Sequence, residues 1–332
     1  MPPVAEPPTK PVPMSTIAHE ILEASGIDSS EAVFTRITGG VSSSTHAAHL
    51  PGRGVIIKQA LAQLDVAQEW TANPNRVVAE AEGLAWFNHI TPDHVPAPIA
   101  VVERLHSLVL PMAPQPSPDL RSVVLENPQD FKPEWPKILG KLLALWHAAD
   151  YRPALGSSLD DTSRLLDLRV NPFYLDMAHT WPEHASAIEA LAEELLSVRT
   201  AVVHGDFTPK NVLCLPEGNL WVVDTEVCHI GNPVIDTASM LAHLVLKALH
   251  YRNDSATAYA LTCARADFLG ELSASSTPPR LDAHVGVFLA VRVAGRAPVS
   301  YLNEPTRHIV STMARALVEG APLEEECQRW LT

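Results

Sequence analysis

The pattern of apolar and polar residues divides the chain into a strand-rich first third and a mostly helical remainder. In the first third, short runs of β-branched residues bounded by glycine and polar residues are typical of strands. Strands are predicted at four places: 33–37, 54–58, 99–103 and 107–110. Helices are expected at 15–24 and 75–89. In the second of these, Val78, Leu84 and Phe87 fit one amphipathic face.

The proline-rich segment Pro111–Pro116 is expected to be a stiff connector, because proline fixes its own φ angle and interrupts regular structure. We place a domain boundary there, between an N-terminal lobe at 15–113 and a C-terminal lobe at 114–332. The first thirteen residues hold six prolines and almost no apolar side chains. Residues 1–14 are therefore interpreted as a disordered tail.

Beyond the connector the apolar spacing becomes helical. Ser117, Pro118 and Asp119 have the residue types of an N-cap, a first helical position and an acidic first turn. Two sets of apolar residues then recur at helical spacing: Leu139, Leu142, Leu143 and Trp146, and Ile188, Leu191, Ala192 and Leu195. One hairpin is predicted, with strands 212–215 and 220–223, and the chain after Asp236 is expected to be mostly helical. The predicted fold class is therefore α+β.

The chain is acidic, with 24 Lys and Arg against 38 Asp and Glu and a formal net charge of −14. Nucleic-acid binders display a basic patch, so no nucleic-acid partner is expected. No apolar run approaches the ~18 residues of a membrane-spanning helix, and no signal peptide is recognised. We therefore expect a cytoplasmic protein without a membrane partner. Its four cysteines lack metal-ligand spacing and are expected to be buried and reduced.

The segment His204–Asn211 carries the strongest chemical signal. Its spacing, His-x-Asp-x4-Asn, is that of a kinase catalytic loop, and Asp224 follows thirteen residues after Asn211. Phosphoryl transfer needs an acceptor for the proton of the attacking hydroxyl, and oxygen ligands that hold Mg²⁺ against the phosphates. Asp206 is the candidate base, and Asn211 and Asp224 are the candidate Mg²⁺ ligands. The predicted hairpin would fold Asp224 back over the loop.

A lysine in the strand-rich part complements this loop. Lys58 ends a β-branched run, as does the kinase lysine that contacts the α- and β-phosphates of the nucleotide. Its partner is expected to be a glutamate on the following helix, Glu80, with Glu82 as the second choice. A lone lysine at a strand end is more often a solvated charge. The functional interpretation is favoured because the same sequence also contains the kinase-like loop at His204–Asn211.

The loop at 39–45 is the candidate phosphate-binding loop. It lacks the G-x-G-x-x-G pattern, but the backbone N–H groups and hydroxyls of Gly40, Ser42 and Ser43 are suited to phosphate oxygens. A flexible turn with no ligand is the equal alternative.

Three segments, HGDFTPKNVL, WVVDTE and GNPVIDTASM, resemble the aminoglycoside phosphotransferase and choline kinase family, which phosphorylates hydroxyls of small molecules. The resemblance covers nearly the whole chain after the tail. It implies a two-lobed protein-kinase-like fold, with ATP as the donor, GTP as the alternative, and Mg²⁺. The roles it implies are Asp206 as catalytic base, Asn211 and Asp224 as Mg²⁺ ligands, Lys58 and Glu80 as the nucleotide-phosphate pair, Pro111 and Met112 at the adenine hinge, and His204 and Asp236 as supports of the loop.

The acceptor is expected to be a sugar or an aminoglycoside-like alcohol. Segments such as 58–61 and 171–174 look closest to the methylthioribose kinase branch, whereas the Thr-Pro-Lys-Asn end of the loop looks more like the aminoglycoside and choline side. Substrate candidates are Glu226, Arg292 and Arg296, the two arginines lying on one face if their segment is helical. Lys210 is either a γ-phosphate contact or a solvated loop lysine. A monomer or a homodimer is expected.

Two other functions compete with a small-molecule kinase. The first is a pseudokinase that binds nucleotide and regulates or scaffolds a partner, although no core catalytic position looks replaced. The second is a protein kinase. Asp224 is followed by Thr225-Glu226 instead of Phe-Gly, and no A-P-E sequence comes after it, which places this alternative last.

Overall fold

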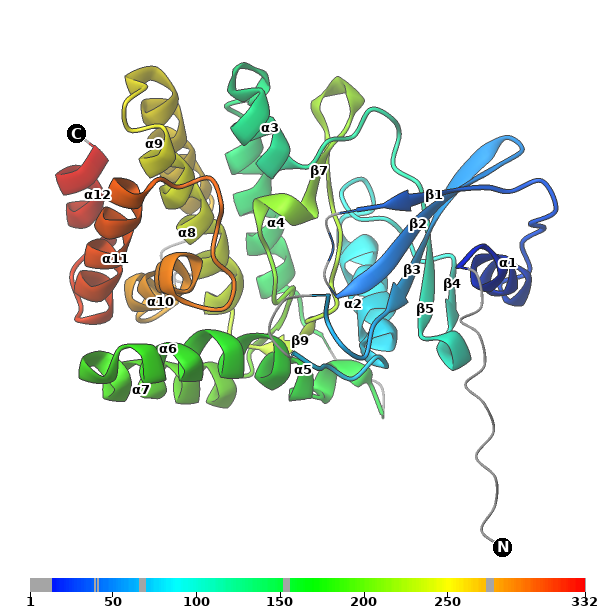
Figure 1. Cartoon of the computed structure of the whole chain (residues 1–332), viewed down its shortest axis with the longest axis horizontal. Helices are drawn as coiled ribbons and strands as arrows, with labels where there is room; N and C mark the ends of the chain where they lie inside the picture. The colour runs from blue at the N-terminus through cyan, green and yellow to red at the C-terminus, as the bar shows by residue number, and fades with distance from the viewer. Residues whose placement is uncertain are drawn as a thin grey trace, which may run out of the picture.

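The structure is a computed structural model that describes residues 14–38, 40, 42–65, 70–151, 156–272 and 278–331. These residues form a strand-rich N-terminal lobe and a helical C-terminal lobe (Figure 1). The N-terminal lobe contains an antiparallel sheet with the strand order β1-β2-β3-β5-β4. The strands are β1 (Val33–Ile37), β2 (Ser43–Leu50), β3 (Arg53–Ala60), β4 (Ala100–Val102) and β5 (Ser107–Pro111). The proposed tail lies almost wholly outside the described residues; Met14 already belongs to the first helix.

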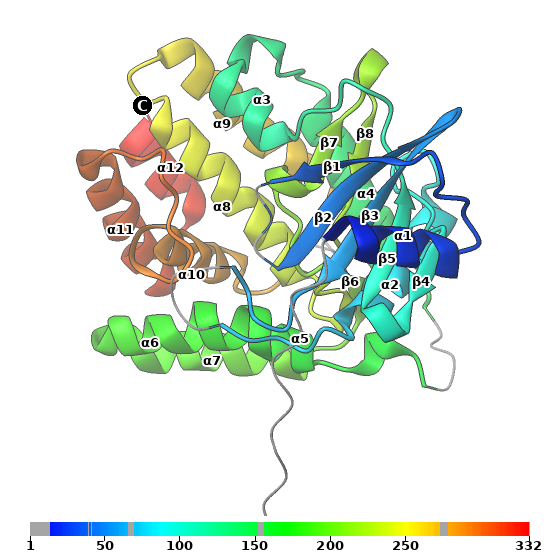
Figure 2. The same ribbon diagram turned by 45° about the vertical axis from the view of Figure 1, so that its right-hand side comes forward.

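Two helices cover opposite faces of this sheet, as Figure 2 shows: α1 (Met14–Ala24) and α2 (Arg76–Ile90). Side chains alternate between the faces of a strand. Val55 and Ile57 of β3 therefore pack on the α1 side, while Ile56 and Lys58 face α2. The alternation turns Lys58 away from α1 and toward the C-terminal lobe.

Strand β2 was not among the predicted elements, because its first residues were interpreted as part of the loop at 39–45. Its sequence, SSTHAAHL, contains few of the β-branched and aromatic residues that mark strands. The strand forms because it pairs along its length with β1 and β3, so that tertiary pairing overrides weak local preference. Ser43 consequently lies in the sheet opposite Ala60, and the loop is shorter than expected.

The C-terminal lobe is built mainly from helices. They are α3 (Leu120–Glu126), α4 (Trp135–Ala148), α5 (Ser163–Leu165), α6 (Asp176–Thr180), α7 (Ala185–Ser197), α8 (Val234–His250), α9 (Ser255–Gly270), α10 (Leu281–Ala294), α11 (Glu304–Val318) and α12 (Leu323–Leu331). A π-helical stretch, η4 (Leu166–Leu175), joins α5 to α6 and contains Pro172. Among the described helices, none has the length and apolar character to cross a membrane.

Helix α3 begins later than the sequence predicted. Asp119 is its N-cap, and the Asp119 carboxylate accepts a hydrogen bond from the backbone N–H of Ser122 at 2.9 Å. The Pro118 carbonyl accepts a hydrogen bond from the N–H of Cys214, at 2.8 Å. This contact ties the start of the C-terminal lobe to the hairpin that follows the loop 204–211.

Two short strand pairs hold the segments with the kinase-like motif. The predicted hairpin is present as β7 (Val212–Cys214) and β8 (Leu220–Val222). A second pair, β6 (Ala201–Val203) and β9 (His229–Gly231), was not predicted. The loop 204–211 connects β6 to β7, and Asp224 lies between β8 and β9. The two pairs therefore bring the loop and Asp224 to the same end of the lobe.

Candidate active site

Lys58 of the N-terminal lobe forms ion pairs with two carboxylates, one in its own lobe and one in the C-terminal lobe. Its ammonium lies 2.8 Å from Glu80 of α2 and forms a second ion pair with Asp224. Burial alone would lower the pKa of Lys58, but the charges of Asp224 and Glu80 outweigh it and raise the pKa. The expected Lys58–Glu80 pair is therefore present. Glu82, the second choice, instead accepts hydrogen bonds from Tyr151, Ser157 and Ser158.

Asp206 is buried and surrounded by donors. One carboxylate oxygen lies 2.7 Å from the Arg169 guanidinium, and the other lies 3.1 Å from the Lys210 ammonium and accepts from Asn211 Nδ2 at 2.9 Å. Burial would raise the pKa of Asp206, but Arg169, Lys210 and Arg292 together hold it well below its usual range. Asp206 is therefore an ionised, fixed carboxylate.

Arg169 pairs with the Asp206 carboxylate and also holds the backbone of the loop. It also donates to the carbonyl of Gly205, at 2.9 Å, and so fixes the loop as well as the carboxylate. The sequence analysis did not single it out. An arginine within the apolar stretch Leu168–Val170 was the available signal, since a buried arginine requires a partner.

Asp236 holds the backbone of the loop 204–211 through hydrogen bonds. It is fully buried in the first turn of α8 and accepts hydrogen bonds from the N–H groups of His204 and Gly205, both at 2.8 Å, and from His147 at 3.1 Å. Burial raises the pKa of Asp236, but these donors outweigh it and lower the pKa. These contacts fix the backbone of the loop at His204 and Gly205.

His204 links the loop to the segment that carries Asp224. Its Nε2 lies 3.1 Å from the carbonyl of Val223, and its Nδ1 accepts from the N–H of Asp206 at 3.2 Å. A carbonyl only accepts and a backbone N–H only donates, which assigns the Nε2–H tautomer. The ring thereby sets the spacing between Asp206 and Asp224.

The loop can turn at Gly205 only because this residue has no side chain. Its φ is +78°, and a Cβ there would lie 2.6 Å from the Val227 carbonyl oxygen. Gly26 has a similar φ of +70° but has no atom within 4 Å of the same position.

This comparison gives a matched pair of variants. We expect Gly26→Ala to lose only the about 1–2 kcal/mol that left-handed backbone costs a residue with a side chain. Gly205→Ala should lose more, because the clash with Val227 adds to that strain, and should also lower turnover by moving Asp206. Denaturant midpoints and ADP release measure both effects. Equal destabilisation of the two variants would contradict the role given to the Val227 contact.

Asn211 and Asp224 offer the ligands that a magnesium ion prefers. Asn211 Nδ2 donates to both the carbonyl and the carboxylate of Asp206, so its Oδ1 is the atom left to bind a cation. Asp224 adds a carboxylate from a backbone with φ of 70°. Among the described residues no group of three or more His, Cys, Asp or Glu side chains is suited to a metal. Two oxygen ligands fit Mg²⁺, which takes much of its coordination from water and substrate phosphates.

Glu226 is paired with an arginine that the sequence analysis did not select. Arg76, 2% exposed at the start of α2, donates to Glu226 at 3.0 Å and also to the carbonyl of Ser42. The segment after Asp224 is thereby tied to the end of the loop that precedes β2. Ser42 and Ser43 are buried, and Gly40 is exposed. Gly39 and Val41 lie outside the described residues.

The other predicted residues fall at two places. Pro111 ends β5 opposite Val55, and the N–H of Met112 donates to the carbonyl of Gly54 at 3.2 Å. Arg292 lies near Asp206, since each charge affects the other's pKa. Arg296 lies beyond the end of α10 and pairs with Asp176. The two arginines would share a helix face only if the segment between them were helical, and it is not, because the helix ends at Ala294 with Gly295 as its C-cap.

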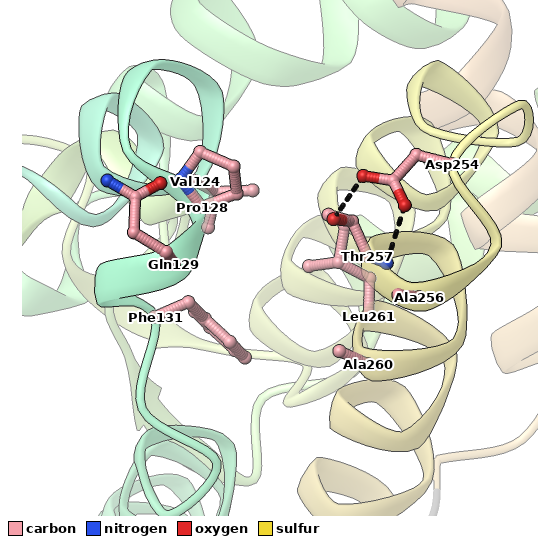
Figure 3. A pocket seen from close by; sticks show the side chains of 9 residues that line it. All are labelled: Val124, Pro128, Gln129, Phe131, Asp254, Ala256, Thr257, Ala260 and Leu261. Carbon is pink, nitrogen blue, oxygen red and sulfur yellow. Dashed lines mark hydrogen bonds between the residues drawn. The ribbon is translucent and has the colours of Figure 1, made fainter.

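A cavity of about 420 Å³ lies away from these residues, between the end of α3 and the start of α9 (Figure 3). Among the described residues that line it, Asp254 alone has an ionisable side chain. That carboxylate caps α9 by accepting from the N–H and hydroxyl of Thr257. The cavity therefore offers no group for phosphoryl transfer.

The sequence matches the model of the phosphotransferase enzyme family over residues 33–284. No curated protein matches the sequence. The fold is similar to that of a choline kinase from Streptococcus pneumoniae, with a TM-score of 0.53 and 12% identity over 96% of each chain. It is also similar to that of a thermostable mutant of an aminoglycoside phosphotransferase, solved with ADP and hygromycin B, with a TM-score of 0.51 and 16% identity over 92% of this chain and 99% of that one.

Because the family model covers more than half of it, the chain belongs to the phosphotransferase enzyme family. The two lobes form the protein-kinase-like fold predicted from the sequence. By its family, the protein is a phosphotransferase.

Proposed function

We propose that the protein transfers the γ-phosphoryl group of ATP to a hydroxyl of a sugar-like alcohol, with Asp206 as the base. The observation that carries the proposal is the Lys58–Asp224 contact between residues 166 positions apart. It supports a single site formed by the nucleotide-binding residues of one lobe and the catalytic loop of the other. The basic side chains near Asp206 favour a sugar over a polycationic aminoglycoside, because like charges repel.

Each residue has a distinct role in this proposal. Lys58, held by Glu80, binds the α- and β-phosphates of the nucleotide. Asn211 and Asp224 hold Mg²⁺, which when bound neutralises phosphate charge during transfer. Asp206 orients the acceptor hydroxyl and receives its proton. Because its pKa is low, it takes that proton late, so positioning contributes more than basicity.

The remaining residues position these groups. Arg76 and Glu226 connect the phosphate loop to the Asp224 segment, with Gly40, Ser42 and Ser43 beside the nucleotide phosphates and Pro111 and Met112 beside its base. Lys210, whose side chain is 44% exposed, lies 3.1 Å from Asp206 and is available to the γ-phosphate.

ADP release from ATP or GTP with Mg²⁺ tests the proposal, using a panel of methylthioribose, other pentoses, choline, aminoglycosides and a peptide. We expect release that depends on a sugar-like acceptor and on Mg²⁺. Nucleotide binding without transfer to any acceptor would instead support the pseudokinase, and phosphate on the peptide would support the protein kinase.

A further inference from the structure

Basic side chains continue from Asp206 into the helices of the C-terminal lobe. Arg169 contacts Asp206, and Arg292 of α10 and His243 of α8 are close enough for the charge of Asp206 to act on them. Lys247 lies one turn beyond His243, about 6 Å along the helix axis. Helices α8 and α10 pack side by side (Figures 1 and 2). Arg169, Arg292 and Lys247 therefore form a row of cations that starts at the catalytic carboxylate. Burial holds the pKa of His243 well below its usual range, so that ring is neutral.

The far end of this row lacks partners. Lys247 is 0% exposed, and its Nζ has no hydrogen-bond partner among the described residues; it lies 5.8 Å from the centre of the Tyr301 ring. The Tyr301 hydroxyl and Arg292 Nε are also buried without a partner there. Buried polar groups in folded proteins are normally hydrogen-bonded, and an unpaired buried charge is strongly unfavourable. Lys247 lies over the Tyr301 ring, and the charge of Arg292, whose Nη1 donates to the Ala297 carbonyl, acts on both groups. A ligand that accepts hydrogen bonds would satisfy these groups.

Nearby acids do not neutralise the row. Asp206 is already bound by two cations. Asp119 caps α3 and faces Arg121 at 3.6 Å. Burial, with repulsion from Arg121 and Arg292, lowers the pKa of Lys247 to about 7, and Asp119 offsets this only in part. A negative charge beside Lys247 and Arg292 would therefore balance the row.

We propose that the acceptor carries an anionic group, a carboxylate or a phosphate, which Lys247 and Arg292 bind while its hydroxyl lies at Asp206. The Tyr301 hydroxyl adds a hydrogen bond to the same group. The inference rests on the proposed function and refines it, from a sugar-like alcohol to a sugar acid or a sugar phosphate.

Binding of anions tests the site without any turnover. We expect D-gluconate and glycerol 3-phosphate, at constant ionic strength, to raise the Tm of the wild type, and neutral sorbitol to leave it unchanged. Lys247→Met should abolish the increase, and Lys141→Met, which changes an exposed lysine of α4, should retain it. The two probes separate a carboxylate from a phosphate. Absence of any anion effect, or an equal effect in Lys247→Met, would overturn the inference.

The steady-state experiment separates this inference from the proposed function. We expect Lys247→Met to raise the KM of an anionic acceptor at least about tenfold, as the loss of one charged hydrogen bond does. The KM of ATP should not change, and Lys247→Arg should restore most of the acceptor affinity. Turnover of a neutral sugar that is unaffected by Lys247→Met would leave the proposed function standing and reject the anionic acceptor. Stabilisation by anions without ADP release from any acceptor would show an anion site at Lys247 but would contradict the proposed function, and with it the assignment of that anion to an acceptor.

The thermal stability of the ligand-free protein tests whether the buried Lys247 ammonium lacks a partner. Lys247 faces Arg121 and Asp119 near α3, Arg292 of α10, the Tyr301 ring and, on its own helix, His243 and His250. Because the pKa of Lys247 is lowered, the unfolded chain binds more protons than the folded one between about pH 7 and the ordinary lysine pKa. The ligand-free Lys247→Met variant should therefore exceed the wild type in Tm, and by more at pH 6 than at pH 9. A lower Tm at both pH values would show that the ammonium has a partner.

Discussion

Asp206→Asn is expected to lower kcat by about 10²–10⁴-fold, the range by which a positioned general base accelerates a reaction. The amide cannot take the proton of the acceptor hydroxyl, and it no longer neutralises Arg169 and Lys210, which lie 2.7 and 3.1 Å from the carboxylate. The affinity for ATP should change little, because Lys58 and Glu80 remain. The measurement is ADP release under saturating substrate, with nucleotide binding followed by titration calorimetry.

A matched control is available on the surface. Asp160 pairs with Arg199 at 3.1 Å, but both side chains are largely exposed. Asp160→Asn removes the same charge from an ion pair and should leave kcat unchanged. If Asp206→Asn turns over at the rate of Asp160→Asn, Asp206 is not the base.

Asp236→Asn is expected to destabilise the fold by about 3–5 kcal/mol, as removal of one partner of a buried charged network does. The carboxylate accepts from two backbone N–H groups and from His147, and an amide cannot satisfy all three donors because its nitrogen is itself a donor. A loss of this size is a large part of the stability of a typical protein. Denaturant unfolding measures the loss of stability in Asp236→Asn. The control variant, Asp160→Asn, should stay within about 0.5 kcal/mol of the wild type.

The stabilisation that the Asp236 carboxylate gives to the fold should be lost in acid. The pKa of Asp236 is lowered in the folded state, because the His147 and backbone donors outweigh burial. Its stabilisation is therefore complete above the ordinary aspartate pKa of about 3.9 and is lost as pH falls through the lower, folded value. The gap between the wild type and Asp236→Asn should stay constant from pH 8 to pH 5 and narrow in stronger acid. A gap that widens as pH falls would contradict the network.

The sequence predicted those parts of the site in which chemistry sets residue type and spacing. The interval from Asp206 to Asn211 and Asp224, and a lysine ending a β-branched strand, are short-range patterns. The structure brings Lys58, Glu80 and Asp224 together as these patterns required. Helix α4 followed equally well from the spacing of its buried leucines and Trp146.

Other parts depended on contacts that no local pattern records. Strand β2 exists because two neighbouring strands pair with it, and its own residues are poor strand formers. Arg169 lies in a π-helical stretch, where side chains do not follow the 3.6-residue period used to assign faces. Lys247 fits the apolar face of α8 in every respect except its charge. It is distinguished by a buried Nζ that has no hydrogen-bond partner in the described part of the chain.

The most direct test of the account is ³¹P NMR of the reaction mixture containing Mg²⁺-ATP, the protein and an acceptor. The account predicts a phosphate ester of the acceptor that forms in equal amount with ADP, and that forms at least about 100-fold more slowly with Asp206→Asn. ADP accompanied only by inorganic phosphate, at a rate independent of acceptor and of Asp206, would contradict transfer to a small-molecule hydroxyl at this site.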